Sequence, residues 1–358
     1  MDRNISCGSR GRSMMLEFTV AAAELEEVGE RTRPLREPWL NYEPRRLPGD
    51  LHTFTLRRDG VPVAATVGTI VRELTQRRFA DPYRLFHDGF PGEEAPARPW
   101  SDLTPQDVLP CAVLMTPEYE AVLAGPEAST SHGVADFVAE LTSWAKTTGM
   151  RSVAVLYVGA QGDLLSQALT DAKYDSVPLG NQNVMQVDWT DADGYAAGLS
   201  YKQRNTVRYE MRKFAKFPGQ LVVRTLEPAE PAVVDLLMEH ATRHNTPLTH
   251  PGAEGLVSRI AELFGSRTRL ICVEDQGSLE AFSLFAEEDT ELVLMLTGTR
   301  YESPHASEAH FQATFYEPAG RAPEWGITQI SYGLGDDATK RRRGCRQIPT
   351  TGHFIKIS

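Results

Sequence analysis

The order of the expected secondary-structure elements repeats once along this chain, and that repeat limits the possible folds more than any other feature. Each half reads as helix, hairpin, strand, helix, strand, helix and strand, without repeating residue identities. The first hairpin is predicted at 52–57 and 61–69 and the second at 270–274 and 279–286, each around a turn that contains glycine. The simplest architecture is mixed α+β, with two halves in tandem, each a mostly antiparallel mixed sheet flanked by helices.

The length of 358 residues agrees with two domains. We expect a loose extension at 1–14, an N-terminal domain at 15–198, a connecting helix at 199–218 and a C-terminal domain at 219–358. The C-terminal domain is the expected catalytic one.

Residues 201–216 contain no glycine or proline, so nothing in this stretch prevents a helix. Val207, Met211 and Phe214 are spaced as one apolar stripe. A second stripe beside it is basic, and with the flanking lysines the stretch has a net charge of +5. Its residues are Lys202, Arg204, Arg208, Arg212, Lys213 and Lys216. Like charges four residues apart destabilise an isolated helix, so either an anionic ligand or acidic side chains of the chain itself must offset them.

A second basic run lies at 340–346, in a chain whose formal net charge is −11. Two focused positive segments on an acidic chain indicate a localised polyanionic ligand, and they argue against general DNA binding. The four cysteines have no paired spacing, which is typical of a reducing cytoplasm. No apolar run is long enough for a membrane span, and 1–14 does not read as a secretory signal.

The segment Leu199-Ser200-Tyr201-Lys202-Gln203-Arg204-Asn205, with Arg208 after it, and the segment 333–344, with Lys340, resemble two motifs of tandem GNAT-fold proteins. The resemblance is to the branch of the Fem-type aminoacyl transferases and acetyltransferase-like proteins. It implies formation of an amide bond by transfer of an aminoacyl group from aminoacyl-tRNA to the amine of a small molecule or peptide. It also implies a functional lysine at Lys340.

The chain departs from the CoA-dependent members of that fold in one place. Those domains carry an Arg/Gln-x-x-Gly-x-Gly/Ala loop after the fourth strand, where backbone N–H groups hold the pyrophosphate. Neither 117–120 nor 298–304 matches this loop. We therefore expect aminoacyl-tRNA as donor, with acyl-CoA as the alternative and a non-catalytic module that binds RNA or a protein partner as a second alternative.

Acyl transfer to an amine requires a polarised donor carbonyl and a neutral amine held within attack distance. We expect Lys340 to stabilise the developing oxyanion, Asp336 or Asp337 to bind the amine or accept its proton, and Tyr332 to donate to the leaving group. Ordinary structural roles remain open for each of these side chains: a surface charge, a helix N-cap and packing. The expected phosphate ligands of the donor are Lys202, Arg204, Arg208, Arg212, Arg341 and Arg343.

Two further patterns bear on a cysteine nucleophile and on a metal site. Cys345 lies among arginines, which favour a thiolate, and His353 is the nearest base in sequence for a cysteine nucleophile. His240 and His244 share a helix face, but no further ligand motif accompanies them, so we expect no metal site. No cofactor is expected beyond the acyl donor itself.

Overall fold

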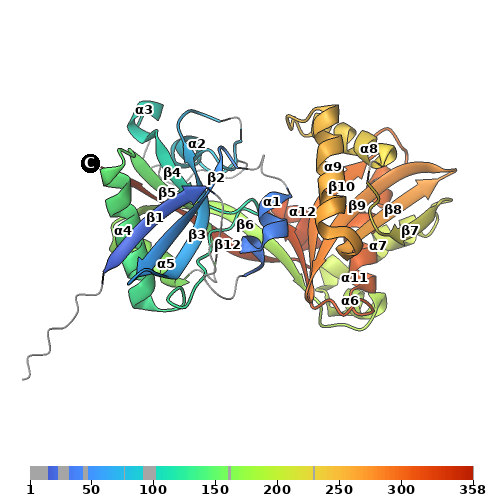
Figure 1. Cartoon of the computed structure of the whole chain (residues 1–358). Coiled ribbons are helices and arrows are strands. Elements are labelled where there is room, and N and C mark those ends of the chain that lie inside the picture. Colours follow the sequence, from blue (N-terminus) through green and yellow to red (C-terminus); the bar gives the residue numbers. More distant parts are fainter. Residues whose placement is uncertain are drawn as a thin grey trace, which may run out of the picture.

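The computed structural model describes residues 15–22, 32–42, 47–75, 77–91, 102–159, 163–228 and 230–357. The expected extension at 1–14 lies outside these residues. The chain forms two lobes that lie side by side and are connected by long strands (Figure 1). Within the described ranges, no helix combines the length and the apolar character that crossing a bilayer requires.

Among the described residues, one twelve-stranded sheet runs through both lobes in the order β1-β2-β3-β4-β5-β12-β6-β11-β10-β9-β8-β7. The pairs β4–β5 and β10–β11 are parallel and the other pairs are antiparallel. The expected mixed, mostly antiparallel α+β fold is therefore confirmed. The strands are β1 (Leu16–Ala22), β2 (Leu51–Arg58), β3 (Val61–Val71), β4 (Cys111–Leu114), β5 (Ser152–Val158), β6 (Asp175–Gln186), β7 (Gln220–Arg224), β8 (Thr268–Asp275), β9 (Ser278–Glu288), β10 (Glu291–Thr299), β11 (Gln329–Gly333) and β12 (Arg346–Lys356).

In the N-terminal lobe, helices α4 (Ser131–Thr147) and α5 (Asp163–Asp171) cover one face of the sheet. Thr130 begins α4 by accepting a hydrogen bond from the Gly133 amide, as N-cap residues do. The other face packs against α2 (Pro82–His87), with α3 (Pro105–Val108) nearby. The segment η1 (Arg33–Leu35) and α1 (Glu37–Asn41) leads from this lobe to the C-terminal one, where Trp39 packs on Phe264 with ring centroids 4.8 Å apart.

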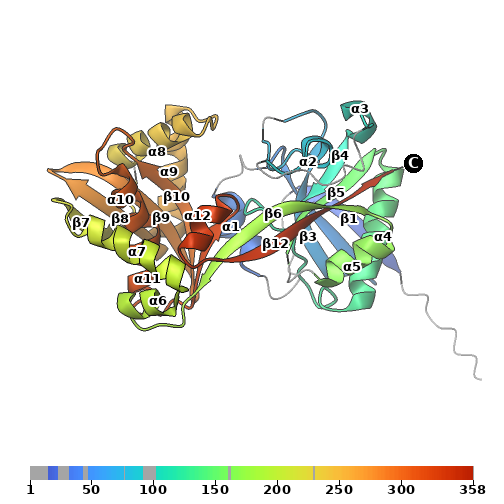
Figure 2. The ribbon, with the colours of Figure 1, turned by 180° about the vertical axis from the view of Figure 1, so that it is seen from behind.

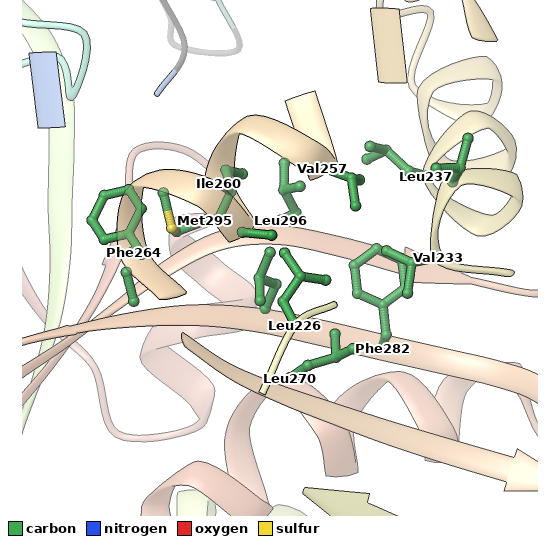
Figure 3. Close-up of a cluster of buried hydrophobic side chains, with 14 of the residues drawn as sticks. Leu226, Val233, Leu237, Val257, Ile260, Phe264, Leu270, Phe282, Met295 and Leu296 are labelled. Carbon is green, nitrogen blue, oxygen red and sulfur yellow. The ribbon is translucent and has the colours of Figure 1, made fainter. Parts of the chain in front are cut away.

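In the C-terminal lobe, α8 (Pro231–Arg243) and α9 (His250–Phe264) cover one face of the sheet. Figure 3 shows Val257 and Ile260 of α9 among the side chains of this core, together with Phe282 and Met295 of the strands below. The opposite face is covered by α6 (Ala192–Gly198), α7 (Tyr201–Phe214), α10 (Ala306–Phe311), the π-helical turn η5 (Gln312–Tyr316) and α11 (Glu317–Arg321).

Helix α7 follows the sequence pattern that predicted it. Ser200 and Gln203 form a capping box at its start, and the apolar stripe faces the lobe. Val207 is fully buried, whereas Met211 and Phe214 pack partly buried against the same cluster. Burying the valine alone contributes roughly 1.5–3 kcal/mol. Because this stripe faces inward, the basic stripe beside it faces solvent.

Strand β12 joins the lobes, since it lies between β5 of the first half and β6. In this register Phe354 pairs with Ala154 on one side and with Asp175 on the other. The residues alone predict a short strand at 184–189 and strand-like sequence at 348–357, which would end the C-terminal half. The structure shows instead that β6 begins at Asp175 and that β6 and β12 run together from lobe to lobe (Figure 2). The proposed domain boundaries remain a prediction.

Strands β10 and β11 separate soon after they start. Their parallel pairing covers only Glu291–Val293 opposite Gln329–Ser331. Beyond it β10 bulges between Leu294 and Leu296 and continues alongside β9 alone. The two strand ends therefore diverge, and unpaired backbone faces the space between them.

Candidate functional site

A cavity of about 670 Å³ opens where the diverging strands meet the N-terminal lobe. The C-terminal lobe contributes the ends of β10 and β11 and the facing sides of α8 and α9. The N-terminal lobe contributes β5 and the turn that follows β4, and η1 also reaches the cavity. The volume is typical of a site for a small ligand.

The N-terminal side of the cavity is acidic and aromatic. Arg33 lies between two carboxylates, bonded to Glu118 and to Glu291 of β10, with its Nε 2.9 Å from Glu291 Oε2. The Glu120 carboxylate accepts no hydrogen bond from the described residues, and burial raises its pKa. Tyr119 and Tyr157 also line the cavity and form an edge-to-face pair, with ring centroids 5.4 Å apart.

The opposite wall carries His240 of α8. Its Nδ1 lies 3.0 Å from the Tyr301 hydroxyl, which is also 3.2 Å from Nε2 of His244. Burial lowers the pKa of His240 to about 4, so the imidazole is neutral at pH 7. Among the described residues, no three His, Cys, Asp or Glu side chains are grouped to hold a metal ion.

Lys340 of α12 (Asp337–Arg342) lies directly behind the end of β11. Its Nζ donates to the carbonyl oxygens of Tyr332, Gly333 and Leu334 at 2.7, 3.2 and 2.8 Å. These bonds use all three N–H donors of the ammonium group. Burial lowers the pKa of Lys340 to about 8. Lys340 therefore fixes the backbone that lines the cavity, and it would reach an oxyanion only by releasing one of these carbonyls.

The two acids before and at the start of α12 differ in their surroundings. Asp336 is exposed, has a left-handed backbone with φ of 48°, and makes no side-chain capping bond. Asp337 accepts hydrogen bonds from the amides of Asn181 and Asn183, at 2.5 and 2.8 Å. Asp337 thus connects α12 to β6, whereas Asp336 remains available to a ligand.

The Tyr332 side chain points away from the cavity, into the core under α10 and α11. Its ring stacks on Phe315 with centroids 4.8 Å apart, and burial raises the pKa of its hydroxyl. Within the described part of the chain, this hydroxyl has no hydrogen-bond partner. The packing alternative considered for Tyr332 therefore agrees with its position better than donation to a leaving group does.

The two basic segments meet in space, because Gln203 of α7 donates to the Arg341 carbonyl of α12 at 2.7 Å. Figure 2 shows both helices on the same side of the molecule. Arg204 is partly buried and donates to the Leu199 carbonyl at 2.8 Å. The exposed cations of this α7–α12 surface are Lys202, Arg208, Arg212, Lys213, Arg341 and Arg342, and Lys213 pairs with Glu308. None of the basic side chains of α7 lines the cavity.

Arg343 has a different environment from the other expected phosphate ligands. Its side chain is 4% exposed, and both oxygens of Glu210 lie within 2.9 Å of its Nη2. Its Nε is 3.2 Å from the Tyr316 hydroxyl, and its guanidinium carbon lies 3.4 Å from the centre of the Phe311 ring. These contacts favour a structural role for Arg343 over binding a donor phosphate.

The cysteine nucleophile considered from sequence is wrong. Cys345 is buried, and burial raises the pKa of its thiol to about 12 despite the nearby cations. His353 instead faces Ser166 of α5 in the other lobe, with Nε2 3.1 Å from the hydroxyl. Burial raises the pKa of the Cys345 thiol more than the positive charges of Lys340 and Arg343 lower it. Counting neighbouring charges in the sequence does not reveal this burial.

Comparison with known proteins relates part of the chain to a family. Residues 201–341, which run from α7 to α12, match the family model described as "Acetyltransferase (GNAT) domain". The match covers 141 of the 358 residues, so the likeness to a GNAT acetyltransferase domain belongs to that region. The search of curated proteins found no match.

Solved structures resemble this protein along most of its length. FemX shares 10% identity, covers 88% of this chain and 90% of its own, and has a TM-score of 0.53. A tandem GNAT protein from the clavulanic acid biosynthesis pathway shares 13% identity, covers 96% and 99%, and also has a TM-score of 0.53. L-PGS from Bacillus licheniformis shares 12% identity, covers 83% and 82%, and has a TM-score of 0.50. At these identities the likeness shows the fold, and the expected tandem GNAT arrangement is confirmed.

Proposed function

We propose that this protein transfers an aminoacyl group from aminoacyl-tRNA to the amine of a small molecule or peptide. The α7–α12 surface holds the tRNA acceptor end, and the amine binds in the cavity between the lobes. The observation that carries the proposal is the position of α12: its exposed arginines belong to the basic surface, while Lys340 holds the strand end that lines the cavity. Donor and acceptor would therefore meet at the end of β11.

The composition of the α7–α12 surface supports an RNA donor. Tyr201 is 79% exposed and Tyr209 is 54% exposed, and both lie among the cations of α7. Exposed aromatic rings provide stacking platforms for unpaired bases, and arginine and lysine provide phosphate contacts. The unpaired end of an acceptor stem offers both kinds of group. An acyl-CoA donor would use the phosphate contacts but leave most of this aromatic area without a partner.

The diverging strands support acyl transfer at this position. Backbone groups of β10 and β11 beyond Val293 and Ser331 do not bond each other. The β11 carbonyls there accept from Lys340 instead, so the β10 backbone on this side is what would orient a bound acyl group. Orientation of this kind can supply about 7–11 kcal/mol of the barrier. Asp336 is exposed beside α12 and outside the cavity lining, so it would contact the amine only during its approach from the donor side.

The alternative donor is acyl-CoA, which the match to an acetyltransferase domain over 201–341 favours. Against it, the segment Gly298-Thr299-Arg300-Tyr301-Glu302-Ser303-Pro304 after β10 lacks the glycine-rich pattern of a pyrophosphate loop. A side-by-side assay decides between the donors. The full-length protein is incubated with a pool of charged tRNAs or with acetyl-CoA, an amine mixture is added, and consumption of each donor is followed.

Under the proposal, charged tRNA is consumed in an amine-dependent way and ribonuclease abolishes the reaction. Arg208→Ala combined with Arg341→Ala weakens tRNA binding about tenfold or more and lowers its salt dependence by roughly one unit per lost phosphate contact. Lys146→Ala combined with Arg151→Ala removes two exposed cations of the other lobe and leaves binding unchanged. Turnover of acetyl-CoA that is indifferent to ribonuclease would overturn the choice of donor.

A further inference from the structure

Glu120 differs from the other acids of the cavity because no described residue neutralises it by direct contact. Glu118 and Glu291 share Arg33, whose Nε and Nη1 they bind from two sides. Glu120 feels the charges of Arg33 and Glu291 but bonds to neither, and its carboxylate lines the cavity. A carboxylate left without a partner in a partly buried position calls for a cationic ligand.

The backbone of Glu120 is part of a tight turn. The Tyr119 amide donates to the Thr116 carbonyl at 3.0 Å, and the Thr116 amide donates to the Glu120 carbonyl at 2.9 Å, which closes a tight turn. Tyr119 has φ of 57° and Tyr157, beside it in β5, has φ of 63°. Non-glycine residues with such angles are uncommon and concentrate at functional sites. Tyr119 and Tyr157 are two such residues, and both line the cavity that Glu120 lines.

Aromatic rings line the same cavity as Glu120. Phe79, Tyr119 and Tyr157 all line the cavity, with Tyr119 5.4 Å from Tyr157 and 6.0 Å from Phe79 between ring centroids. The Tyr157 hydroxyl donates to the Phe79 carbonyl at 2.5 Å, which fixes the ring. Aromatic faces attract cations, and an adjacent carboxylate adds a charged contact. The combination is selective for an ammonium group over a neutral group of the same shape.

We infer that Glu120, with Tyr119 and Tyr157, forms an ammonium-binding site through which the N-terminal lobe recognises the acceptor of the reaction. The acceptor class is a primary amine that enters as the ammonium ion and fits within the cavity, such as a small amine or the amino end of a short peptide. This inference rests on the proposed function only where it calls the bound amine the acceptor of the reaction. Binding of the ammonium ion is testable without any acyl donor.

Binding of n-butylammonium to the full-length protein is measured by NMR titration at pH 7, with n-butanol as the neutral analogue of similar shape. The wild type is expected to bind the amine about tenfold or more tightly than the alcohol. Glu120→Gln, which keeps the size of the side chain, removes this preference. Glu262→Gln, on an exposed position of α9 outside the cavity lining, keeps it. Equal binding of amine and alcohol by the wild type, or an unchanged preference in Glu120→Gln, overturns the site.

A pH titration of the wild type gives a second test that needs no variant. The groups that share the cavity with Glu120 are Arg33, Arg77, Glu118, Glu291, His240 and Arg259. Burial raises the pKa of Glu120, so amine binding weakens as the pH falls and the carboxylate takes up a proton, while n-butylammonium keeps its charge. The profile of Glu120→Gln is flat. A wild-type profile that is equally flat overturns the site.

The outcomes also separate this inference from the proposed function. Amine binding that depends on Glu120, in a protein that consumes neither charged tRNA nor acetyl-CoA, supports the site and refutes the transferase proposal. In an active protein, Glu120→Gln raises the KM for the amine and leaves the Kd for the donor unchanged. The double variant with Arg208→Ala and Arg341→Ala instead raises the Kd for the donor and leaves the KM for the amine unchanged.

Discussion

Replacement of Arg343 by alanine is the sharpest test of how this fold is held together. The side chain connects three elements: it binds Glu210 of α7 with two bonds, contacts the Tyr316 hydroxyl of the π-helical turn, and lies over Phe311 of α10. It also donates from Nη1 to the Thr339 carbonyl at 3.0 Å. Alanine removes all of these contacts and leaves the Glu210 carboxylate, 18% exposed, without its cation.

Breaking a buried ion pair by removing one partner costs about 3–5 kcal/mol, because the other charge is left uncompensated. The partial exposure of Glu210 places the expected loss near the lower end, about 3 kcal/mol. For a protein of this size that corresponds to a fall in Tm of about 4 °C. Urea unfolding followed by circular dichroism measures the change in the free energy of unfolding.

Arg342→Ala is the matched control, because Arg342 is the exposed neighbour on α12 and its removal is expected to change stability by less than about 0.5 kcal/mol. Arg343→Ala combined with Glu210→Gln should cost less than the sum of the two single changes, because each single change leaves an unpaired group. If Arg343→Ala unfolds at the same urea concentration as Arg342→Ala, the buried network does not stabilise the fold. Arg343 would then return to the set of possible phosphate ligands.

Two further predictions follow from buried titratable groups. Burial lowers the pKa of both His240 and His310 to about 4, so between about pH 6.5 and 4 only the unfolded chain binds protons at these sites. Stability should fall across this window by about 1–3 kcal/mol in total, after allowance for partial exposure. His310→Asn should flatten the dependence in urea unfolding at pH 4.5 and 7, and an equally steep dependence in the variant would contradict this origin. Lys340→Met should lower the free energy of unfolding by about 1–3 kcal/mol, because three strand-end carbonyls lose their donor. Wild-type stability together with a loss of kcat would instead assign Lys340 to the oxyanion.

The elements of this protein could be predicted where local pattern determines structure. Helix α7 from Tyr201 was expected from its apolar spacing, and the continuous apolar run at 152–158 is typical of a buried strand, as β5 is. The first part of β6 was not, because Pro178 and Gly180, with φ of 76°, break a strand pattern. This part is a strand because β12 pairs with it, and such long-range pairing leaves no trace in local spacing.

The candidate site was only partly predictable, for the same reason. The sequence pointed to the basic helix and to Lys340, and the structure brings α7 and α12 together. It gave no sign that Arg343 would bind Glu210, since the two residues are far apart in the chain. The cavity was missed because Glu120 and His240 come from different lobes and neither belongs to a motif. The departure of 117–120 from the pyrophosphate-loop pattern was the one available signal near Glu120.

The position of β12 has a consequence for how the chain folds during synthesis on the ribosome. Strands β5 and β6 emerge early, but the strand that fills the gap between them is residues 346–356. Until residues 346–356 are synthesised, the edges of β5 and β6 that pair with β12 are open, and strands of other chains can add to them. Completion of the N-terminal lobe therefore waits for the C-terminal half to be synthesised, and each lobe reaches its final form only together with the other.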